Sequence, residues 1–253
     1  FFNYIKALIV MKKLLLIIGI MTATNLFSKT PAFESDVFET SMGKLTITFI
    51  GHGSLMFEVN QTVIHVDPVG QFGDYSLLSQ ADLILITHDH YDHLDLSAIK
   101  KIAKSDTKII IPSVCKKAVP EGFIMQNGAS TTFNNISIEA VPAYNLKHKN
   151  DKGEFFHPKG VGNGYVLTFG NFKVYVAGDT ENTPEMKSLK NIDVAFLPMN
   201  LPFTMTPEMV ADAARSFKPK ILYPYHYGNT DPNQLVKLLK NEPNIEVRIR
   251  KLR

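Results

Sequence analysis

Residues 83–95 constrain the fold of this chain more than any other stretch. The stretch begins with Leu-Ile-Leu-Ile, a short apolar run that is typical of a strand buried on both faces. After Thr87 it passes directly into three histidines and three aspartates within eight residues. A loop that follows a buried strand is where an open α/β layer usually carries its chemistry. The stretch therefore predicts an α/β fold with a functional site at the end of this strand.

The side chains of this loop are of the types that bind divalent cations. Imidazoles and carboxylates are the expected ligands of Zn²⁺ and, less strictly, of Mn²⁺. His88 and His90 are two residues apart, so their side chains point the same way on an extended chain and can bind one ion. Asp92 and His93 follow at once, and a turn there would present them to a second ion. The alternative is a solvated polar loop, which the density of ligand residues and the buried strand at its base disfavour.

The rest of the chain predicts two successive halves with the same order of elements. Residues 43–69 alternate and turn in the manner of an antiparallel meander, and residues 131–144 predict a second one. Strands and helices follow each meander, including a helix that begins with Thr206 as N-cap and Pro207 as its first residue. Two sheets packed face to face with helices outside would bury this pattern.

Two more predicted strands end in candidate ligands. Asp179 follows the apolar strand at residues 172–177, and His226 closes the strand at residues 221–226. The alternatives are a turn-capping role for Asp179 and a packed core histidine at position 226. Because each residue closes an apolar strand, as Thr87 does, a role in the same site is favoured.

The sequence His-Asp-His-Tyr-Asp-His at residues 88–93 resembles the H-x-H-x-D-H signature of the metallo-β-lactamase superfamily of hydrolases. The resemblance extends to Gly-Asp-Thr at residues 178–180 and to His226. It implies an α/β fold, a four-layer αββα sandwich of two mixed sheets with helices outside. It also implies two divalent metal ions, Zn²⁺ in the first place and Mn²⁺ as the alternative. The metal ligands that it implies are His88, His90, Asp92, His93, Asp179 and His226.

The resemblance further implies how such a site works. Asp179 would bridge the two ions, and a hydroxide held between them would attack a phosphoryl or carbonyl centre. Asp92 would orient this hydroxide or protonate the leaving group. Asp92 and Asp179 are thus the predicted catalytic carboxylates.

One position departs from the family pattern. Relatives usually carry a further histidine ligand after the strand at residues 141–143, where this chain has Asn145. Either Asn145 binds weakly or through water, or a nearby histidine substitutes, His157 being the better candidate and His148 the weaker. Both histidines could equally be exposed loop residues. An oxygen-richer first site would shift the preference from Zn²⁺ towards Mn²⁺.

Three residues have predicted supporting roles. In relatives, an aspartate placed like Asp67 supports a metal-bound imidazole, although Asp67 could simply cap the turn before Pro68. His52, in a glycine turn, either lines the pocket or is a plain turn residue. Lys159 is a possible partner for an anionic substrate.

Within the superfamily, the sequence is similar to a compact group. This group includes the lactonase that opens ascorbate-6-phosphate and N-acyl-phosphatidylethanolamine phospholipase D. The resemblance disfavours a β-lactam substrate, because true metallo-β-lactamases typically carry Cys or Ser where Asp179 stands. It therefore implies hydrolysis of a phosphodiester or a lactone or other ester in a small-molecule or lipid-like anionic substrate. The alternative, motivated by Asn145, is a metal- or ligand-binding protein that retains the fold with little turnover.

The N-terminus has the pattern of an export signal. Met11-Lys12-Lys13 is basic and residues 14–21 are apolar, so residues 1–30 are interpreted as an extension and signal, and residues 31–253 as the hydrolase domain. This predicts a periplasmic or cell-envelope location. The alternative is an uncleaved anchor, which would be the only contact with a membrane.

Charge and cysteine content exclude other classes. The net charge is +3 and the basic residues are spread, so no nucleic-acid binding is expected. The basic residues that do gather, at residues 248–253, are interpreted as a solvated end. Cys115 is the single cysteine, so the chain forms no internal disulfide, and this thiol is expected to be a small buried hydrophobe.

Overall fold

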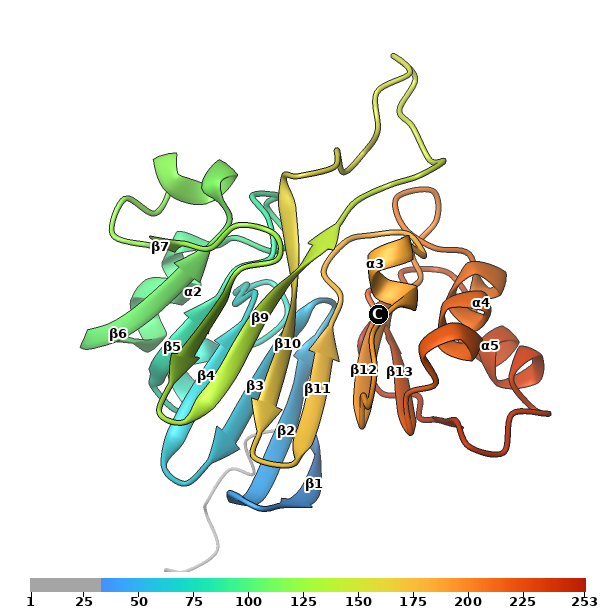
Figure 1. Ribbon diagram of the computed structural model, residues 1–253. Coiled ribbons are helices and arrows are strands. Elements are labelled where there is room, and N and C mark those ends of the chain that lie inside the picture. The colour runs from blue at the N-terminus through green and yellow to red at the C-terminus, as the bar shows by residue number, and fades with distance from the viewer. Residues whose placement is uncertain (1–32) are drawn as a thin grey trace, which may run out of the picture. The chain divides into compact units, whose positions relative to one another are not determined.

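Two seven-stranded sheets face each other in residues 33–253, the part of the chain that the computed structural model describes (Figure 1). The export signal predicted at residues 1–30 lies outside the described residues. The strands of the first sheet, in spatial order, are β1 (Glu34–Thr40), β2 (Gly43–Gly51), β3 (Ser54–Val59), β4 (Thr62–Val66), β5 (Ala81–Leu85), β6 (Ala103–Ile111) and β7 (Phe123–Ile124). Those of the second sheet are β14 (Glu246–Val247), β13 (Ile221–Tyr225), β12 (Val194–Pro198), β11 (Phe172–Val176), β10 (Gly162–Phe169), β9 (Ile136–Ala143) and β8 (Ser130–Phe133).

Each sheet is an antiparallel meander extended by parallel strands. In the first sheet β1 to β4 pair antiparallel, and β5, β6 and β7 add in parallel. In the second sheet β8 to β11 pair antiparallel, and β12, β13 and β14 add in parallel. The predicted repetition of a meander followed by strand–helix units is therefore confirmed, and both sheets are mixed.

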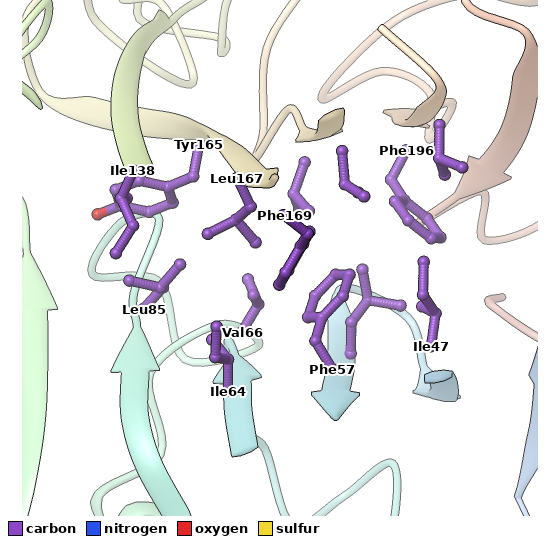
Figure 2. Packing of buried hydrophobic residues seen from close by; sticks show 14 of the residues in the cluster. Ile47, Phe57, Ile64, Val66, Leu85, Ile138, Tyr165, Leu167, Phe169 and Phe196 are labelled. Carbon is purple, nitrogen blue, oxygen red and sulfur yellow. The ribbon is translucent and has the colours of Figure 1, made fainter. Parts of the chain in front are cut away.

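The main core lies between the two sheets (Figure 2). Side chains of the first sheet that face it include Ile47, Phe57, Ile64, Val66 and Leu85, and those of the second include Ile138, Tyr165, Leu167, Phe169 and Phe196. Alternate residues of β10 point to opposite faces, so Tyr165 and Leu167 enter this core while Val166 packs in a second cluster on the outer face. A strand covered on both sides must be apolar at nearly every position, which explains the continuous runs in the sequence.

Helices cover the outer faces and complete the sandwich (Figure 1). They are α2 (Leu96–Ile102), α3 (Pro184–Lys187), α4 (Pro207–Phe217) and α5 (Asn233–Leu238), with 3₁₀ turns η1 (Tyr75–Leu77) and η2 (Ser113–Lys117). The buried stripe of α4 includes Val210 and Phe217 and packs with Leu197 of β12 in the outer cluster. As predicted, the Thr206 side chain caps α4, and Asp95 caps α2. None of the helices within residues 33–253 is both long enough and apolar enough to cross a membrane.

The C-terminal residues differ from their prediction as a solvated end. Arg250 donates two hydrogen bonds from Nη2 to Asp36 of β1, at 2.9 and 2.8 Å, and Arg248 Nη1 lies 3.4 Å from the same carboxylate. Strand β14 precedes these arginines and extends the second sheet. The interpretation is therefore wrong for Arg248 and Arg250, because the acid that pairs with them lies on a strand more than two hundred residues earlier. Cys115, by contrast, is buried and free, as expected.

Candidate metal centre

The candidate site residues follow strands that end at one edge of the sandwich. His52 follows β2, Asp67 follows β4, and the histidine loop follows β5. Strands β2 and β4 are both antiparallel to β3, and β5 is parallel to β4, so these three strands end at the same side. In the second sheet, Asp179 follows β11 and His226 follows β13, which run parallel to each other through β12. A hydrogen bond from His226 N to His52 O, at 3.2 Å, joins the two sheets at this edge.

The carboxylate of Asp179 lies at the centre of the site, with 3% of its side chain exposed. Four imidazole Nε2 atoms approach its oxygens, at 3.3 Å for His157, 3.4 Å for His93, 3.4 Å for His226 and 4.0 Å for His88. These residues come from three separate loops and from both sheets. The fold thus gathers around one small volume residues that lie far apart in the sequence.

Several polar atoms in this volume are buried without a hydrogen-bond partner. They are Nε2 of His88, His93, His157 and His226, and Oδ1 of Asp179. Leaving a buried polar atom unpaired costs about 1–3 kcal/mol, so a cluster of them needs a reason. A cavity of about 20 Å³ lies among His88, His90, His157 and Asp179, which is room for one water-sized particle. Nitrogen and carboxylate donors that are buried, unpaired and convergent fit a divalent metal ion.

The possible ligand atoms form overlapping groups. Those of His88, His90 and His157 all lie within 4.8 Å of one another. A second group, also within 4.8 Å, contains His52, Asp92, His93 and His226, and a third joins Asp179 to His88 and His93. The group of Asp179 therefore shares one possible ligand residue with each of the other two groups, His88 with the first and His93 with the second.

A comparison with protein families decides the assignment. Residues 46–226 match the model of a β-lactamase superfamily domain, which is well over half of the chain. The chain belongs to the metallo-β-lactamase superfamily.

Similar proteins agree with this family. A metal-dependent hydrolase of the UPF0173 group from Enterococcus faecalis is 35% identical over 72% of this chain and 87% of the relative. One from Methanoculleus marisnigri is 30% identical over 72% of this chain and 81% of the relative. The crystal structure of a candidate metal-dependent hydrolase from Parabacteroides distasonis superimposes with a TM-score of 0.83 and 52% sequence identity, covering 87% of this chain and all of that one. The protein is a metal-dependent hydrolase with this fold.

In this metallo-β-lactamase-fold hydrolase, His157 and Asn145 have different positions relative to the ligand cluster. His157 is buried and its Nε2 faces Asp179. The Asn145 side-chain oxygen points at His157 and accepts hydrogen bonds from its backbone N and from Nδ1, both at 2.7 Å. The structure therefore places the His157 ring, and not the Asn145 side chain, beside Asp179 and in one group with His88 and His90.

Asp67 supports the site through hydrogen bonds with His93 and Thr87. It is fully buried, and its Oδ2 accepts hydrogen bonds from His93 Nδ1 at 2.8 Å and from Thr87 Oγ1 at 2.6 Å, while Oδ1 accepts from Thr87 N at 2.8 Å. Because His93 donates from Nδ1, its Nε2 is left to face Asp179. This is the contact that the supporting role predicted for Asp67 requires.

His52 lies in the site, where it contacts Asp92 and Phe72. Its Nε2 is 3.1 Å from Asp92 Oδ2, and its ring stacks on Phe72 with centroids 4.5 Å apart. The neighbouring Gly53 leaves space for the ring of His93, since a Cβ at Gly53 would lie 2.9 Å from His93 Cε1. The glycine turn is therefore fitted to the site, and His52 contacts Asp92 from it.

Two residues singled out in the sequence stand outside the cluster. Lys159 is 64% exposed and pairs with Glu185 at 3.1 Å. His148 Nδ1 lies 2.8 Å from Glu181 Oε1 rather than near Asp179. Glu181 itself is fully buried and was not predicted. One feature of the sequence could have identified it. Glu181 is an acid two residues after Asp179, just beyond an apolar strand, where a solvated acid is not expected.

The charges of the site depend on one another. Burial raises the pKa of Asp179, but the imidazoles of His226 and His93 outweigh burial and hold the pKa well below its ordinary value. Burial lowers the pKa of His93, but Asp179 and Asp67 outweigh burial and raise that pKa to about 9. Burial holds the pKa of His88 well below its ordinary value. The negative charge that favours a proton on His93 would equally favour a cation, and a metal ion would displace that proton.

Proposed function

We propose that this hydrolase binds two divalent cations, one on each side of Asp179, and cleaves a phosphodiester or a lactone or other ester. The proposed substrate is a small-molecule or lipid-like anion. The observation that carries the proposal is the convergence of bare, buried imidazole nitrogens on one buried carboxylate. His88, His90 and His157 would hold one ion, and Asp92, His93 and His226 the other, with Asp179 shared.

The donor set supports Zn²⁺ as the natural cation. With His157 facing the cluster, the proposed ligands include three imidazoles on the first side, and His93 and His226 on the second. Imidazole-rich sites suit Zn²⁺, whereas Mn²⁺ prefers carboxylate and carbonyl oxygens. Asn145 suggested an oxygen-rich first site, which was the stronger reason to expect Mn²⁺. The geometry does not favour such a site.

Two cations held in this way would lower the pKa of a water molecule and stabilise negative charge on the substrate oxygen. Asp92 lies at the outer side of the cluster with 21% of its side chain exposed, so it can contact substrate or solvent. Burial raises the pKa of Asp92, but His226 and His52 outweigh burial and hold it well below its ordinary value. The ionised carboxylate accepts hydrogen bonds, which favours Asp92 as the group that orients the attacking water over Asp92 as a proton donor.

The surroundings of the site support a substrate with an apolar part. The cavity among the ligands, about 20 Å³, is too small for a substrate, which must bind outside it. Phe203 is exposed and lies beside the site. Its backbone oxygen accepts a hydrogen bond from Asn145, and its ring contacts Phe156, which lines the cavity. Leu146 and Leu201 are also exposed next to these residues in the chain. An acyl or other apolar group could lie against them, and Lys159 could meet an anionic group only by leaving Glu185.

The competing hypothesis of a binding protein with little turnover is weakened by the same geometry. It was motivated by Asn145 at an expected ligand position. His157 supplies an imidazole there instead, so the departure in the sequence no longer implies a missing ligand.

The test is hydrolysis by the purified full chain loaded with Zn²⁺ or Mn²⁺. We expect about two ions per chain, cleavage of bis(p-nitrophenyl) phosphate or of simple lactones, and a loss of roughly 100-fold or more in His88→Ala. His65→Gln is the matched control, because His65 is equally buried but lies outside the cluster. Failure to cleave either substrate class would refute the proposed chemistry, and one loosely held ion with no effect of His88→Ala would support the binding protein.

The proposed location is the periplasm or the cell envelope. It rests on the sequence of residues 11–30 alone, with its basic start and apolar run.

A further inference from the structure

We propose that Glu181 and Asn145 are positioning residues that fix the ring orientation and the tautomer of His157. This inference rests on the proposed metal site, because it concerns how one of its ligands is presented. Glu181 lies outside the groups of possible ligand atoms, and the side-chain oxygen of Asn145 is engaged by His157. Both act on the cluster through hydrogen bonds that run from a buried carboxylate through an amide to an imidazole.

Glu181 is the fixed end of this chain of hydrogen bonds. Its side chain is fully buried, yet it accepts from the backbone N–H groups of Leu146 at 2.9 Å, Lys147 at 2.9 Å and His148 at 2.7 Å. A buried carboxylate that is satisfied in this way is a rigid anchor for residues 145–148.

The amide of Asn145 is oriented by two acceptors. Its Nδ2 donates to Glu181 Oε1 at 3.0 Å and to the backbone oxygen of Phe203 at 2.9 Å. An amide nitrogen has two hydrogens, so both are used. The opposite orientation would point the amide oxygen at a carboxylate and a carbonyl, which is unfavourable. The oxygen Oδ1 must therefore point towards His157.

This orientation determines the tautomer of His157. Asn145 Oδ1 has no hydrogen and can only accept, so His157 Nδ1, at 2.7 Å, must carry the proton. The same oxygen accepts from the backbone N of His157, also at 2.7 Å, which fixes the ring relative to its own main chain. In the neutral ring Nε2 then carries the lone pair, and this nitrogen is buried without a hydrogen-bond partner 3.3 Å from Asp179 Oδ2.

These hydrogen bonds hold the ring of His157 in place although His157 lies in a long loop. His157 lies in the long connection between β9 and β10, which extends beyond the strand ends (Figure 1), whereas the other buried imidazoles follow strands more closely. A loop residue needs external contacts to hold its ring in one orientation. Glu181 provides them from the segment that also carries Asp179, so the shared carboxylate and the anchor of His157 move together. Loss of such supporting contacts to a metal ligand typically weakens metal binding about 10–100-fold.

The experiment measures Zn²⁺ affinity by competition with a chromophoric chelator in the full chain and in Asn145→Ala and Glu181→Gln. We expect one of the two ions to bind about 10–100-fold more weakly in both variants, with the other little changed. Asn182→Ala is the matched control, because Asn182 is the next residue after Glu181 but bonds to Asp212 at the surface. Its two affinities should equal those of the unmodified chain. Equal affinities in Asn145→Ala would overturn the proposal.

A second measurement does not depend on any variant folding. Long-range ¹H–¹⁵N correlation spectra of the Zn²⁺-loaded chain report which ring nitrogen of each histidine is protonated. The proposal requires Nδ1–H on His157, and Nε2–H there would overturn it. If the unmodified chain binds no Zn²⁺, the proposed function fails. If it binds two ions while the Asn145→Ala and Glu181→Gln results are negative, only the positioning role fails.

Discussion

At Asp179 a buried charge is stabilised without lysine or arginine. Its ion pairs within residues 33–253 are all with imidazoles, of His88, His93, His157 and His226. Burying a carboxylate is costly unless it is paired and hydrogen-bonded, and here Oδ1 has no hydrogen bond. The imidazoles that face it, above all His226 and His93, lower the pKa of Asp179 in spite of burial. The residues around Asp179 are thus arranged to bring positive charge to its carboxylate, and a metal ion can supply that charge in place of a proton.

Three residues at the same place have a strained backbone. His52, Asp67 and His226 have φ angles of 54°, 46° and 45°, in the left-handed region that non-glycine residues rarely adopt. Each such residue costs on the order of 1 kcal/mol and persists only when its surroundings require it. All three follow strands at the edge where the ligands meet. The strain sharpens the turns that aim these side chains into the site.

Position after an apolar strand was enough to find some site residues from the sequence but not others. It pointed to His88, Asp179 and His226, because a strand fixes where its last residues emerge. It left Asn145 and His157 as alternatives, because the two are twelve positions apart in the loop between β9 and β10, and the path of that loop decides which of them turns inward. It missed Glu181, whose burial depends on accepting the N–H groups of that same loop.

The pH dependence of stability provides a prediction at a residue outside the site. Burial lowers the pKa of His65 from 6.5 to about 4, although the carbonyl of Ser79 partly offsets burial. The unfolded chain therefore binds a proton between these values that the folded chain does not, and stability falls as pH decreases from 6.5 towards 4. This residue should account for about 2 kcal/mol of lost unfolding free energy between pH 7 and pH 5.

His65→Gln removes this titration and retains a donor for Ser79. Urea unfolding of both proteins at a series of pH values should show a shallower slope in the variant. Parallel slopes in the two proteins would mean that His65 takes up its proton at the same pH in the folded chain as in the unfolded chain.

Among the elements, the strands at the sheet edges were the hardest to predict. Strand β1 has the sequence Glu-Ser-Asp-Val-Phe-Glu-Thr, in which Phe38 alone is buried, so no alternating pattern marks it. Strand β14 has only two residues. The central strands were predicted because burial on both faces leaves an apolar run, whereas an edge strand is recognisable only from what it pairs with.

The contact between β1 and the C-terminal residues gives a prediction at this scale. Asp36 accepts from Arg250 and from the hydroxyl of Tyr223, with 16% of its side chain exposed. Asp36→Asn removes the charge that holds the arginine, so we expect a loss of about 1 kcal/mol in unfolding free energy. Hydrogen exchange should also become faster at the amide of Arg248, which donates to Leu222 of β13.

Glu246→Gln is the control for this element. Glu246 pairs with Arg248 at 2.7 Å, but its side chain is 56% exposed, and exposed pairs contribute little. A loss of stability as large as that in Asp36→Asn would show that surface charge in general, rather than the buried contact with β1, stabilises the C-terminal residues.

At the scale of the whole molecule, each half of the chain supplies only part of the site. The first sheet contributes His88, Asp92 and His93, and the second contributes Asp179 and His226. Neither set is complete alone, so the site forms only when the sheets pack through their shared core. Cations bound there would connect the two sheets at this edge, in addition to the hydrogen bond from His226 N to His52 O.

Metal removal should therefore lower the stability of the entire fold. A ligand present at about a thousand times its dissociation constant stabilises the folded state by about 4 kcal/mol, which corresponds to a shift in melting temperature of roughly 10 °C for a domain of this size. We expect a chelator to lower the melting temperature of the Zn²⁺-loaded chain by about this amount, and added Zn²⁺ to restore it. His88→Ala should melt between the Zn²⁺-loaded and the metal-free chain and respond less to the chelator, because the first group of ligands is broken and the second is intact. If a chain shown to hold two ions melts at the same temperature after both are removed, the ions do not connect the sheets, and packing alone holds this edge closed.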